Sequence, residues 1–516
     1  MLQTSTATTP DVGEQVSVAE EARPRWRQPD LVVLLLVLGA AVTHRLYLAV
    51  TTDFPINDGG LFVAYVEAGA RSFPWLPEAI SYNGLELPHA YPPLGFWLGG
   101  LLVKLGFGAI GIIHVLPPVM NAVWVVLLAL LFLRDGHSRL FTAAAVAVLV
   151  VAFRSYEWLV MGGGLTRGLG ALFLVLTLLA LGGTRGRESS PLSVRAALLA
   201  GICVGGAILS HLEWGLLAAT CVVVQRALRS RTVENFLVTL TVAGGGAALC
   251  VLPWVLLVVS RHGLEPFLAA SGTSEWNLAD TAARLEGYAR AQWPNLLLAV
   301  GGAVLLVRRH LFWPVFILLC LVLTPRHSLT PLVVPISYIT VYGFEAVVRM
   351  VRRATSQWRE RSEVGAVVAL ALIAVVLGGL AVERTRPVST LFRPLSDDVR
   401  EAMAWVRDEH AGARFAVVTD PVWWYDASAE WFPQLTGATS STTVQGTEWL
   451  PDDAYQRRID AVMATKAAPT CAELVQRVLD LEPVEFVWTE ARQQCFETPA
   501  FQAVFRNADV TVFAVR

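Results

Sequence analysis

Long apolar runs separated by short polar segments dominate the first three quarters of the chain. A membrane-spanning helix needs about 20 mostly apolar residues to cross a hydrocarbon core of roughly 30 Å. Candidate runs occupy residues 31–50, 92–107, 112–133, 140–154, 165–182, 196–210, 212–225, 233–259, 294–307, 311–324, 328–348 and 363–382. The pattern predicts a polytopic α-helical membrane protein with an N-terminal tail at 1–30 and a membrane module at 31–382.

One of these runs, 92–107, is not expected to cross the membrane. It is short, opens with Pro92-Pro93 and contains Lys104. Because Lys and Arg collect on the cytoplasmic side, leaving this run at the interface places the Arg-rich connections on one side. We therefore expect about 11 transmembrane helices, a cytoplasmic N-terminus, a long first outer loop at 51–111 and an extracytoplasmic tail.

From residue 383 to 516 the pattern changes to that of a small soluble α/β domain. Strand-like runs RFAVVTD, EFVWTE and VTVFAV alternate with helical segments, which predicts a partly parallel, three-layer arrangement. Ser396 is expected to cap a helix that Gly412 ends. Cys471 and Cys495 are expected to form a disulfide if the domain is extracytoplasmic, and two unrelated thiols are the alternative.

Aromatic residues are concentrated between the first and second of these strands. They are Trp423, Trp424, Tyr425, Trp431, Phe432 and Trp449. Such residues fit a sugar-stacking or membrane-docking surface, but simple core packing is the more frequent use of buried aromatics.

The composition supports the membrane assignment and narrows the partners. Of the 516 residues, 54% are hydrophobic and 16% are charged, which is more apolar than a soluble globular protein needs. The formal net charge is −2, so nothing indicates nucleic-acid binding, and membrane lipids are the expected surroundings.

Ionisable residues gather in the loops that are expected on the outer side. Asp53 and Asp58 follow the first span, and Arg167 follows a triple glycine at 162–164 that we expect to be flexible. The other members of this group are Glu67, Glu78, Glu86, His89, Glu157, His211, Glu213, Arg326 and His327. A charge in the hydrocarbon costs at least about 2.5–3.5 kcal/mol, so ionisable residues close to the membrane suggest a function. Ordinary loop solvation, interfacial anchoring and helix capping are the alternatives to function.

Together these side chains fit one task, which is binding a phosphorylated lipid and removing a proton from an acceptor hydroxyl. Arg and His would hold the phosphate, Arg by its fork of donors. An Asp within hydrogen-bond reach of the hydroxyl would act as the general base.

With these features the chain resembles the GT-C superfamily of integral membrane glycosyltransferases. The resemblance rests on the acidic motif that starts the first outer loop, the YPPL element from Tyr91 to Leu94 that leads an interfacial helix, and the later outer-loop arginine. The superfamily includes protein O-mannosyltransferases, aminoarabinose transferases of lipid A and oligosaccharyltransferases. The resemblance covers residues 30–350 and is architectural more than literal.

The resemblance implies a polyprenyl-phosphate or polyprenyl-diphosphate sugar donor and inversion at the anomeric carbon. It implies Asp58 as the catalytic base, with Asp53 as the second choice, and Arg326 as a contact to the donor phosphate. Arg167 and His327 are further candidates for that contact. Members of the family often carry Asp-Glu where this sequence has NDGG, which leaves metal dependence and cofactors open.

The function predicted from these features is transfer of a sugar to a cell-envelope glycan, lipid or protein on the outer face of the plasma membrane. A transporter or flippase for a lipid or amphiphile is the alternative, because His44 and Arg45 lie inside the first span. A non-catalytic relative that uses its C-terminal domain in envelope assembly is a third possibility.

Overall fold

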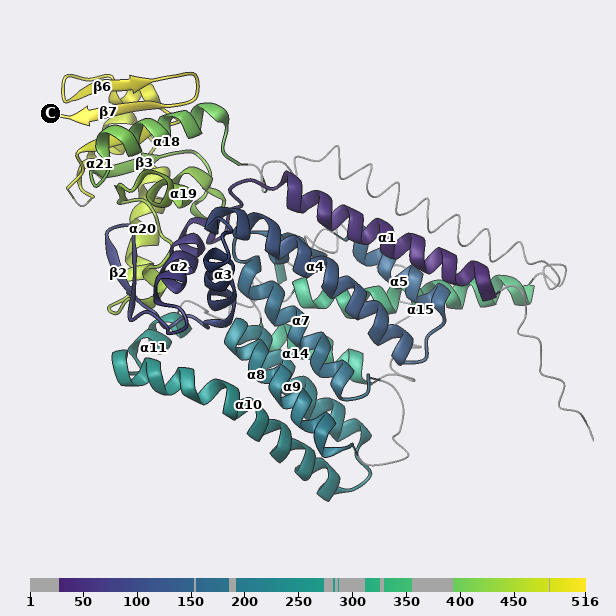
Figure 1. Cartoon of the computed structure of the whole chain (residues 1–516). Coiled ribbons are helices and arrows are strands. Elements are labelled where there is room, and N and C mark those ends of the chain that lie inside the picture. Colours follow the sequence, from purple (N-terminus) through teal and green to yellow (C-terminus); the bar gives the residue numbers. More distant parts are fainter. Residues whose placement is uncertain are drawn as a thin grey trace, which may run out of the picture.

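The computed structural model describes residues 27–152, 155–184, 192–272, 311–324, 329–354, 394–481 and 483–516, with a few isolated positions between them. Figure 1 shows a bundle of long helices with a mixed domain at one end. The bundle helices are α1 (Arg27–Thr51), α4 (Ala109–Arg134), α5 (Arg139–Val151), α7 (Gly164–Ala180), α8 (Val194–Ser210), α9 (Leu212–Arg229), α10 (Val233–His262), α14 (Phe312–Leu323) and α15 (Leu329–Ala354).

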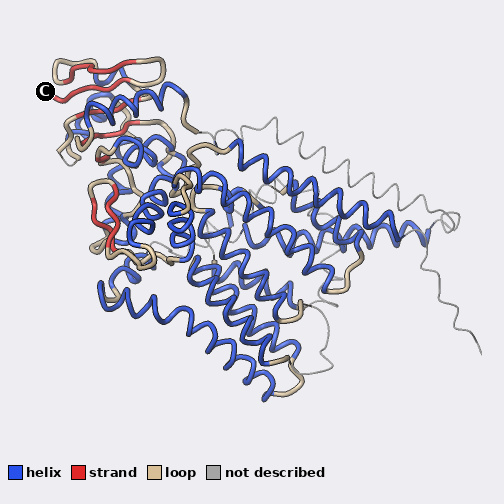
Figure 2. The backbone as a smooth tube through the Cα atoms, in the orientation of Figure 1, coloured by secondary structure: helices blue, strands red, loops and turns tan. Residues whose placement is uncertain are grey.

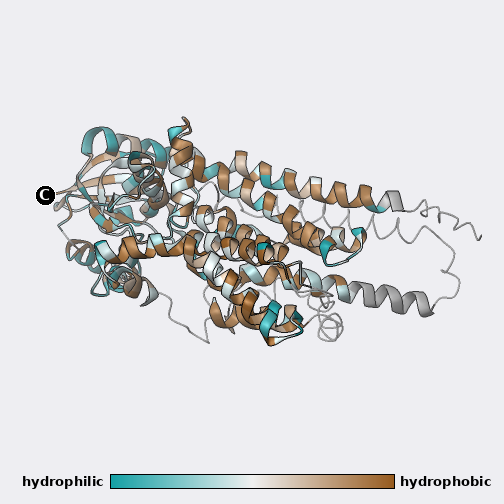
Figure 3. Ribbon diagram, turned by 60° about the horizontal axis from the view of Figure 1, so that its bottom comes forward, coloured by the Kyte–Doolittle hydropathy of each residue, from teal (hydrophilic) through white to brown (hydrophobic). Residues whose placement is uncertain are grey.

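Three of the described helices are long and apolar enough to cross a membrane, namely Asp30–Thr51 within α1, then α4 and α10. They coincide with the predicted runs at 31–50, 112–133 and 233–259. Six more apolar helices are shorter, with α5, α7, α8, α14 and part of α15 among them. The predicted runs at 294–307 and 363–382 lie outside the described residues, so the number of spans stays a prediction. Figure 3 shows hydrophobic residues along most of the bundle, in contrast to the C-terminal domain.

A layer of short elements lies between the bundle and the C-terminal domain. They are α2 (Gly59–Ser72), β1 (Ala79–Tyr82), β2 (Leu85–Pro88), α3 (Leu94–Lys104), α6 (Glu157–Val160) and α11 (Glu265–Gly272). Strands β1 and β2 form a hairpin around Asn83-Gly84, both at positive φ, as a tight turn of this sequence requires. With 11 residues, α3 is about 16 Å long and too short to cross a bilayer, as expected for the 92–107 run.

The C-terminal domain is built on a five-stranded sheet in the order β4-β3-β5-β7-β6. Its elements are α18 (Asp397–His410), β3 (Arg414–Val418), η3 (Trp423–Tyr425), α19 (Ala427–Thr436), β4 (Thr439–Ser440), η4 (Thr447–Trp449), α20 (Ala454–Lys466), α21 (Cys471–Leu479), β5 (Phe486–Thr489), η5 (Gln493–Phe496), β6 (Phe501–Arg506) and β7 (Thr511–Val515). Strand β3 pairs in parallel with β4 and β5, while β7 pairs antiparallel with β5 and β6. Figure 2 shows that the strands all lie at this end of the molecule.

Helices cover both faces of this sheet, which confirms the predicted three-layer, partly parallel arrangement. Phe415 and Val417 of β3 pack against α18 and α19, whereas the alternate residues Ala416 and Val418 pack against α21. Ser396 caps α18 by accepting the N–H of Val399, as the sequence predicts.

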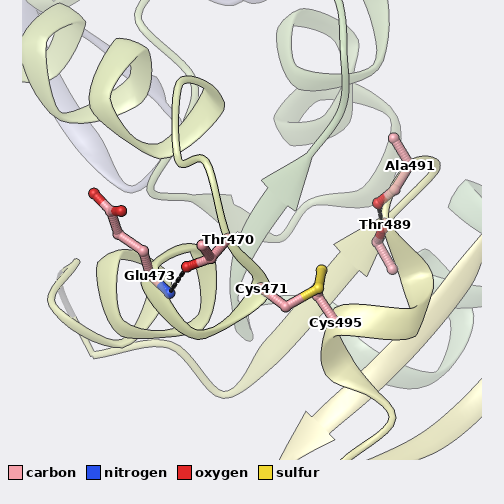
Figure 4. The surroundings of a disulfide bond; sticks show 6 residues. All are labelled: Thr470, Cys471, Glu473, Thr489, Ala491 and Cys495. Carbon is pink, nitrogen blue, oxygen red and sulfur yellow. Dashed lines mark hydrogen bonds between the residues drawn. A yellow bond between two sulfur atoms is a disulfide. The ribbon is translucent and has the colours of Figure 1, made fainter.

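The predicted disulfide between Cys471 and Cys495 is present (Figure 4). It joins the first residue of α21 to η5. Cys495 is part of the hydrophobic cluster that also contains residues of β5 and β7. Disulfides persist in oxidising compartments, so this one agrees with an extracytoplasmic position for the domain.

The first loop and the C-terminal domain share one hydrophobic core. It includes Leu61 and Phe62 of α2, Tyr82 of the hairpin, and Phe415 and Trp431 of the C-terminal domain. The domain is therefore packed on the loop that carries Asp53 and Asp58, and it is not a separate appendage.

Candidate active site

Asp58 lies immediately before α2, in a short stretch of unusual backbone. Asn57 and Asp58 both have φ of 74°, a left-handed conformation that Asn and Asp tolerate better than most residues. The two glycines that follow allow close packing. A Cβ at Gly59 would lie 2.5 Å from the Trp431 ring, and one at Gly60 would lie 2.8 Å from the carbonyl oxygen of Glu430. The NDGG sequence thus fixes a tight turn against the C-terminal domain.

Arg167, on the first turns of α7, completes a polar pair with Asp58. Its Nη2 lies 3.4 Å from Asp58 Oδ2, and its Nη1 donates to Asn57 Oδ1 at 2.6 Å. The side chain of Arg167 is 9% exposed and that of Asp58 is 25% exposed, so the guanidinium is buried while the carboxylate reaches solvent. An Arg in this position can neutralise a second anion that approaches from the exposed side.

The triple glycine before α7 is tightly packed in the structure, contrary to the flexible segment that the sequence suggests. The N–H of Gly162 donates to Ile56 at 3.0 Å, and the N–H of Gly163 donates to Asn57 at 2.5 Å. A Cβ at Gly162 would collide with the backbone of Gly59. These glycines allow the two loops to touch, which brings Arg167 to Asp58.

A pocket opens beside Arg167 at the ends of α6, α9 and α15. Its lining consists of Trp158, Leu159, Arg167, Glu213, Trp214, Leu217, Thr324, Thr330 and Pro331. The guanidinium also lies 5.3 Å from the centre of the Trp158 ring, a cation–π contact. The pocket therefore has mostly apolar walls, with Arg167 and Glu213 as the charged residues of its lining.

Two more of the predicted residues, Tyr91 and His211, lie close enough to this pair for its charges to affect their pKa. The Tyr91 hydroxyl is 3.5 Å from Thr166 Oγ1, and its ring packs on Trp449. Burial raises the pKa of Tyr91, so it remains a neutral hydrogen-bonding group. Burial and the charge of Arg167 lower the pKa of His211 to about 3, so it is uncharged at neutral pH. Glu157 is buried in α6 beside Trp158.

Asp53 and His89 are placed differently. Asp53 Oδ2 lies 2.8 Å from Nη1 of Arg400, and its backbone N–H donates to Phe392, so it joins the loop to the C-terminal domain. His89 is buried and packs 5.3 Å from the Tyr65 ring, and burial lowers its pKa to about 4. Among the described residues neither ring nitrogen of His89 has a hydrogen-bond partner.

The remaining predictions concern residues that the structure does not describe, or concern a metal. Arg326 and His327 fall in the segment 325–328, outside the described residues, between Thr324 and Leu329. Within the described ranges no group of three or more His, Cys, Asp or Glu side chains could hold a metal ion.

The contribution of the C-terminal domain to this site is not evident from the sequence. Glu430 of α19 accepts hydrogen bonds from the backbone on both sides of Asp58, and Glu448 is close enough to add to the raised pKa of Tyr91. The sequence SAEWFP gave one indication, because its acid, Glu430, is surrounded by residues typical of a hydrophobic core. Of the predicted aromatic group, Trp431, Phe432 and Trp449 are buried, whereas Trp424 and Tyr425 are exposed.

No family model matches the sequence, and comparison with curated proteins gives no significant match. Solved structures do match the fold. The oligosaccharyltransferase AglB from Archaeoglobus fulgidus, in complex with an inhibitory peptide and a dolichol-phosphate, aligns with a TM-score of 0.57 and 11% identity, over 90% of this chain and 70% of that one. ArnT from Cupriavidus metallidurans in the apo state aligns with a TM-score of 0.51 and 16% identity, over 95% and 97% of the two chains.

The arabinofuranosyltransferase AftD from Mycobacteria also matches, with a TM-score of 0.51 and 15% identity, over 95% of this chain and 40% of that one. All three are membrane glycosyltransferases of the GT-C superfamily. The chain therefore has the fold of that superfamily, and the resemblance expected from its sequence is confirmed at the level of the fold.

Proposed function

We propose that this protein is a membrane glycosyltransferase that moves a sugar from a polyprenyl-phosphate carrier to an acceptor hydroxyl. The observation that carries the proposal is the pairing of the partly exposed carboxylate of Asp58 with the buried guanidinium of Arg167 in a GT-C fold. The dolichol-phosphate bound to AglB supports a lipid-phosphate carrier for the donor.

In this proposal Asp58 is the general base. Its carboxylate takes the proton of the acceptor hydroxyl, whose oxygen attacks the anomeric carbon of the donor sugar. The bond from that carbon to the phosphate oxygen breaks, and the polyprenyl phosphate leaves with the bonding electrons. Attack on the face opposite the leaving group inverts the anomeric centre. Arg167 stabilises the charge that grows on the phosphate, by the donor fork that suits such groups.

The small pocket beside Arg167 offers one contact point for the phosphate end of such a donor. Trp158, Trp214 and Pro331 give it apolar walls next to the guanidinium, and Glu213 is an acid in the same lining. Thr324 and Thr330 line the same pocket and flank the segment with Arg326 and His327 in the sequence. We infer that these two residues supply further contacts to the phosphate.

The same proposal places the enzyme in the plasma membrane as a multi-pass protein with a cytoplasmic N-terminus. The active site and the C-terminal domain then face the outside, where the Cys471–Cys495 disulfide is stable. The acceptor is a glycan, lipid or protein of the cell envelope.

The transporter alternative rested on His44 and Arg45, and the structure gives Arg45 a structural role. Its guanidinium is fully buried and donates to Asn121 Oδ1 at 2.8 Å and to Ser155 Oγ at 2.9 Å. It also lies 4.2 Å from the centre of the Tyr156 ring. These contacts fix the loop after α5 against α1 and α4, so nothing about Arg45 favours a transport path.

The proposal is tested by following transfer in membranes that contain the wild type, Asp58→Asn or Asp420→Asn. Each is supplied with radiolabelled polyprenyl-phosphate sugars of several types, and label in the cell-envelope fraction is measured. We expect the wild type and the exposed control Asp420→Asn to transfer one of the sugars, and Asp58→Asn to fail. Transfer by Asp58→Asn at the wild-type rate would disprove the base assignment, and no transfer by the wild type would favour a non-catalytic relative.

A further inference from the structure

A buried carboxylate of the C-terminal domain holds the backbone on both sides of Asp58. Glu430 Oε2 accepts the N–H of Asn57 at 2.8 Å, and its Oε1 accepts the N–H of Gly59 at 2.7 Å. Gln445 Nε2 donates to Oε2 at 3.2 Å. The residue is 1% exposed, and its own carbonyl oxygen accepts the Tyr82 hydroxyl at 2.9 Å. Glu430 is thus fixed at both its backbone and its side chain.

Such a burial is costly unless the carboxylate is well solvated by the protein. Burial, and after it the nearby charge of Asp58, raise the pKa of Glu430. Three N–H donors and the positive N-terminal end of α2 offset that cost. A glutamine in this place could offer one oxygen as an acceptor, and its amide N–H groups would face the N–H of Asn57 or Gly59. The site therefore requires a carboxylate.

The position of Asp58 explains what this contact achieves. An Asp just before a helix ordinarily accepts the N–H groups of the first turn with its own side chain. Asp58 makes no such cap hydrogen bond, since its left-handed backbone turns the side chain away from α2 and toward Arg167. Glu430 takes over the N–H of Gly59, the first residue of α2.

Neighbouring contacts hold the same segment from other sides. Trp431 Nε1 donates to the carbonyl oxygen of Pro55 at 3.1 Å, and Arg167 binds the Asn57 side chain. Glu430 is the member of this set that accepts the backbone N–H groups of both residues flanking Asp58, namely Asn57 and Gly59. Removing one of its two acceptor oxygens would allow the turn to relax toward the ordinary capped form.

We propose that Glu430 is a positioning residue for Asp58, by which the C-terminal domain caps α2 from outside and keeps the Asp58 carboxylate directed at Arg167 and the substrate. The domain is then a part of the active site. The proposal rests on the proposed function for its activity measurement, and has a second measurement that does not.

The test compares full-length Glu430→Gln with Glu497→Gln, a surface acid paired with Arg506 that serves as the matched control. Amide hydrogen exchange of the 54–62 segment is measured in purified protein by mass spectrometry. We expect the Gly59 amide to exchange at least about tenfold faster in Glu430→Gln and unchanged in the control. If Glu430→Gln does not fold, Gln445→Ala replaces it, because it removes only one hydrogen bond to the Glu430 carboxylate. The expected increase in the exchange rate of the Gly59 amide is then smaller.

The second measurement is transfer from a radiolabelled polyprenyl-phosphate sugar. We expect kcat to fall about 10- to 100-fold in Glu430→Gln with little change in the KM for the donor. In an Asp58→Asn background the same substitution should have no further effect, because Glu430 acts through Asp58. Unchanged exchange, unchanged kcat, or an additional loss in the Asp58→Asn background would each overturn the proposal. If the wild type transfers no sugar, the proposed function fails and hydrogen exchange alone decides about Glu430.

Discussion

Asp53 and Asp58 lie in the same loop after α1, and the structure gives their carboxylates different surroundings. Asp58 faces the buried guanidinium of Arg167, and Glu430 accepts the backbone N–H of the next residue, Gly59. Asp53 faces Arg400 of the C-terminal domain, in a pair whose side chains are 28% and 39% exposed. Two acids of one loop thus meet different cations, and under the proposed function Asp58 serves catalysis while Asp53 serves domain docking.

The largest expected effect is the difference between neutralising the two acids. Asp58→Asn should lower kcat for sugar transfer by about 10²- to 10⁴-fold, because a general base is lost. Asp53→Asn should stay within about threefold of the wild type, because a partly exposed ion pair contributes little. Both are measured in membranes with matched protein levels and one radiolabelled donor. Equal losses would show that the loop conformation, and not the base at position 58, limits the reaction.

A second comparison concerns the two arginines. Arg167→Lys keeps the charge but loses the fork that contacts Asp58 and Asn57 together, so transfer should slow by about 10- to 100-fold. Arg400→Lys should slow transfer by no more than a few fold, since that pair is partly solvated. The same assay checks both, and an Arg167→Lys enzyme as fast as the wild type would contradict a role for Arg167 in binding the leaving phosphate.

Much of the fold could be predicted from the sequence because it follows local patterns. The apolar runs predicted the bundle helices, and alternation predicted β3, β5 and β7. Strand β4 has only two residues, and β6, an edge strand that is mostly exposed, carries little hydrophobic alternation, so neither was recognised. The Cys471–Cys495 pair was predicted from its place in the acidic tail.

The candidate site was only half predictable, for a physical reason. Asp58 and Arg167 were identified because charges near a membrane are costly, but their meeting depends on glycines that pack tightly. The segment with Gly162 was predicted to be flexible, because a sequence does not show which atoms fill the space beside a glycine. Glu430 is separated from Asn57 by 373 positions and could not be assigned to the site without the fold.

The close packing of the Asp58 turn can be tested with glycine substitutions. A methyl group at Gly59 would press on the Trp431 ring, so Gly59→Ala should lower the free energy of unfolding by about 1–3 kcal/mol through overpacking. Gly39→Ala is the matched control in α1, where a Cβ meets nothing within 4 Å, and it should be neutral or slightly stabilising. Thermal unfolding in detergent compares the two. A Gly59→Ala protein as stable as Gly39→Ala would mean that the C-terminal domain is not docked on this turn.

The smallest expected effect is the coupling between Asp53 and Arg400. A double-mutant cycle of Asp53→Asn and Arg400→Gln should give a coupling free energy of about 0.2–1 kcal/mol, because a partly exposed pair gains little over its solvated ions. Salt should screen much of that coupling. Unfolding free energies of the four proteins at low and high ionic strength supply the measurement. A coupling of several kcal/mol that salt does not reduce would show that Asp53 is as confined as Asp58, and the contrast between the two acids would then lose its physical basis.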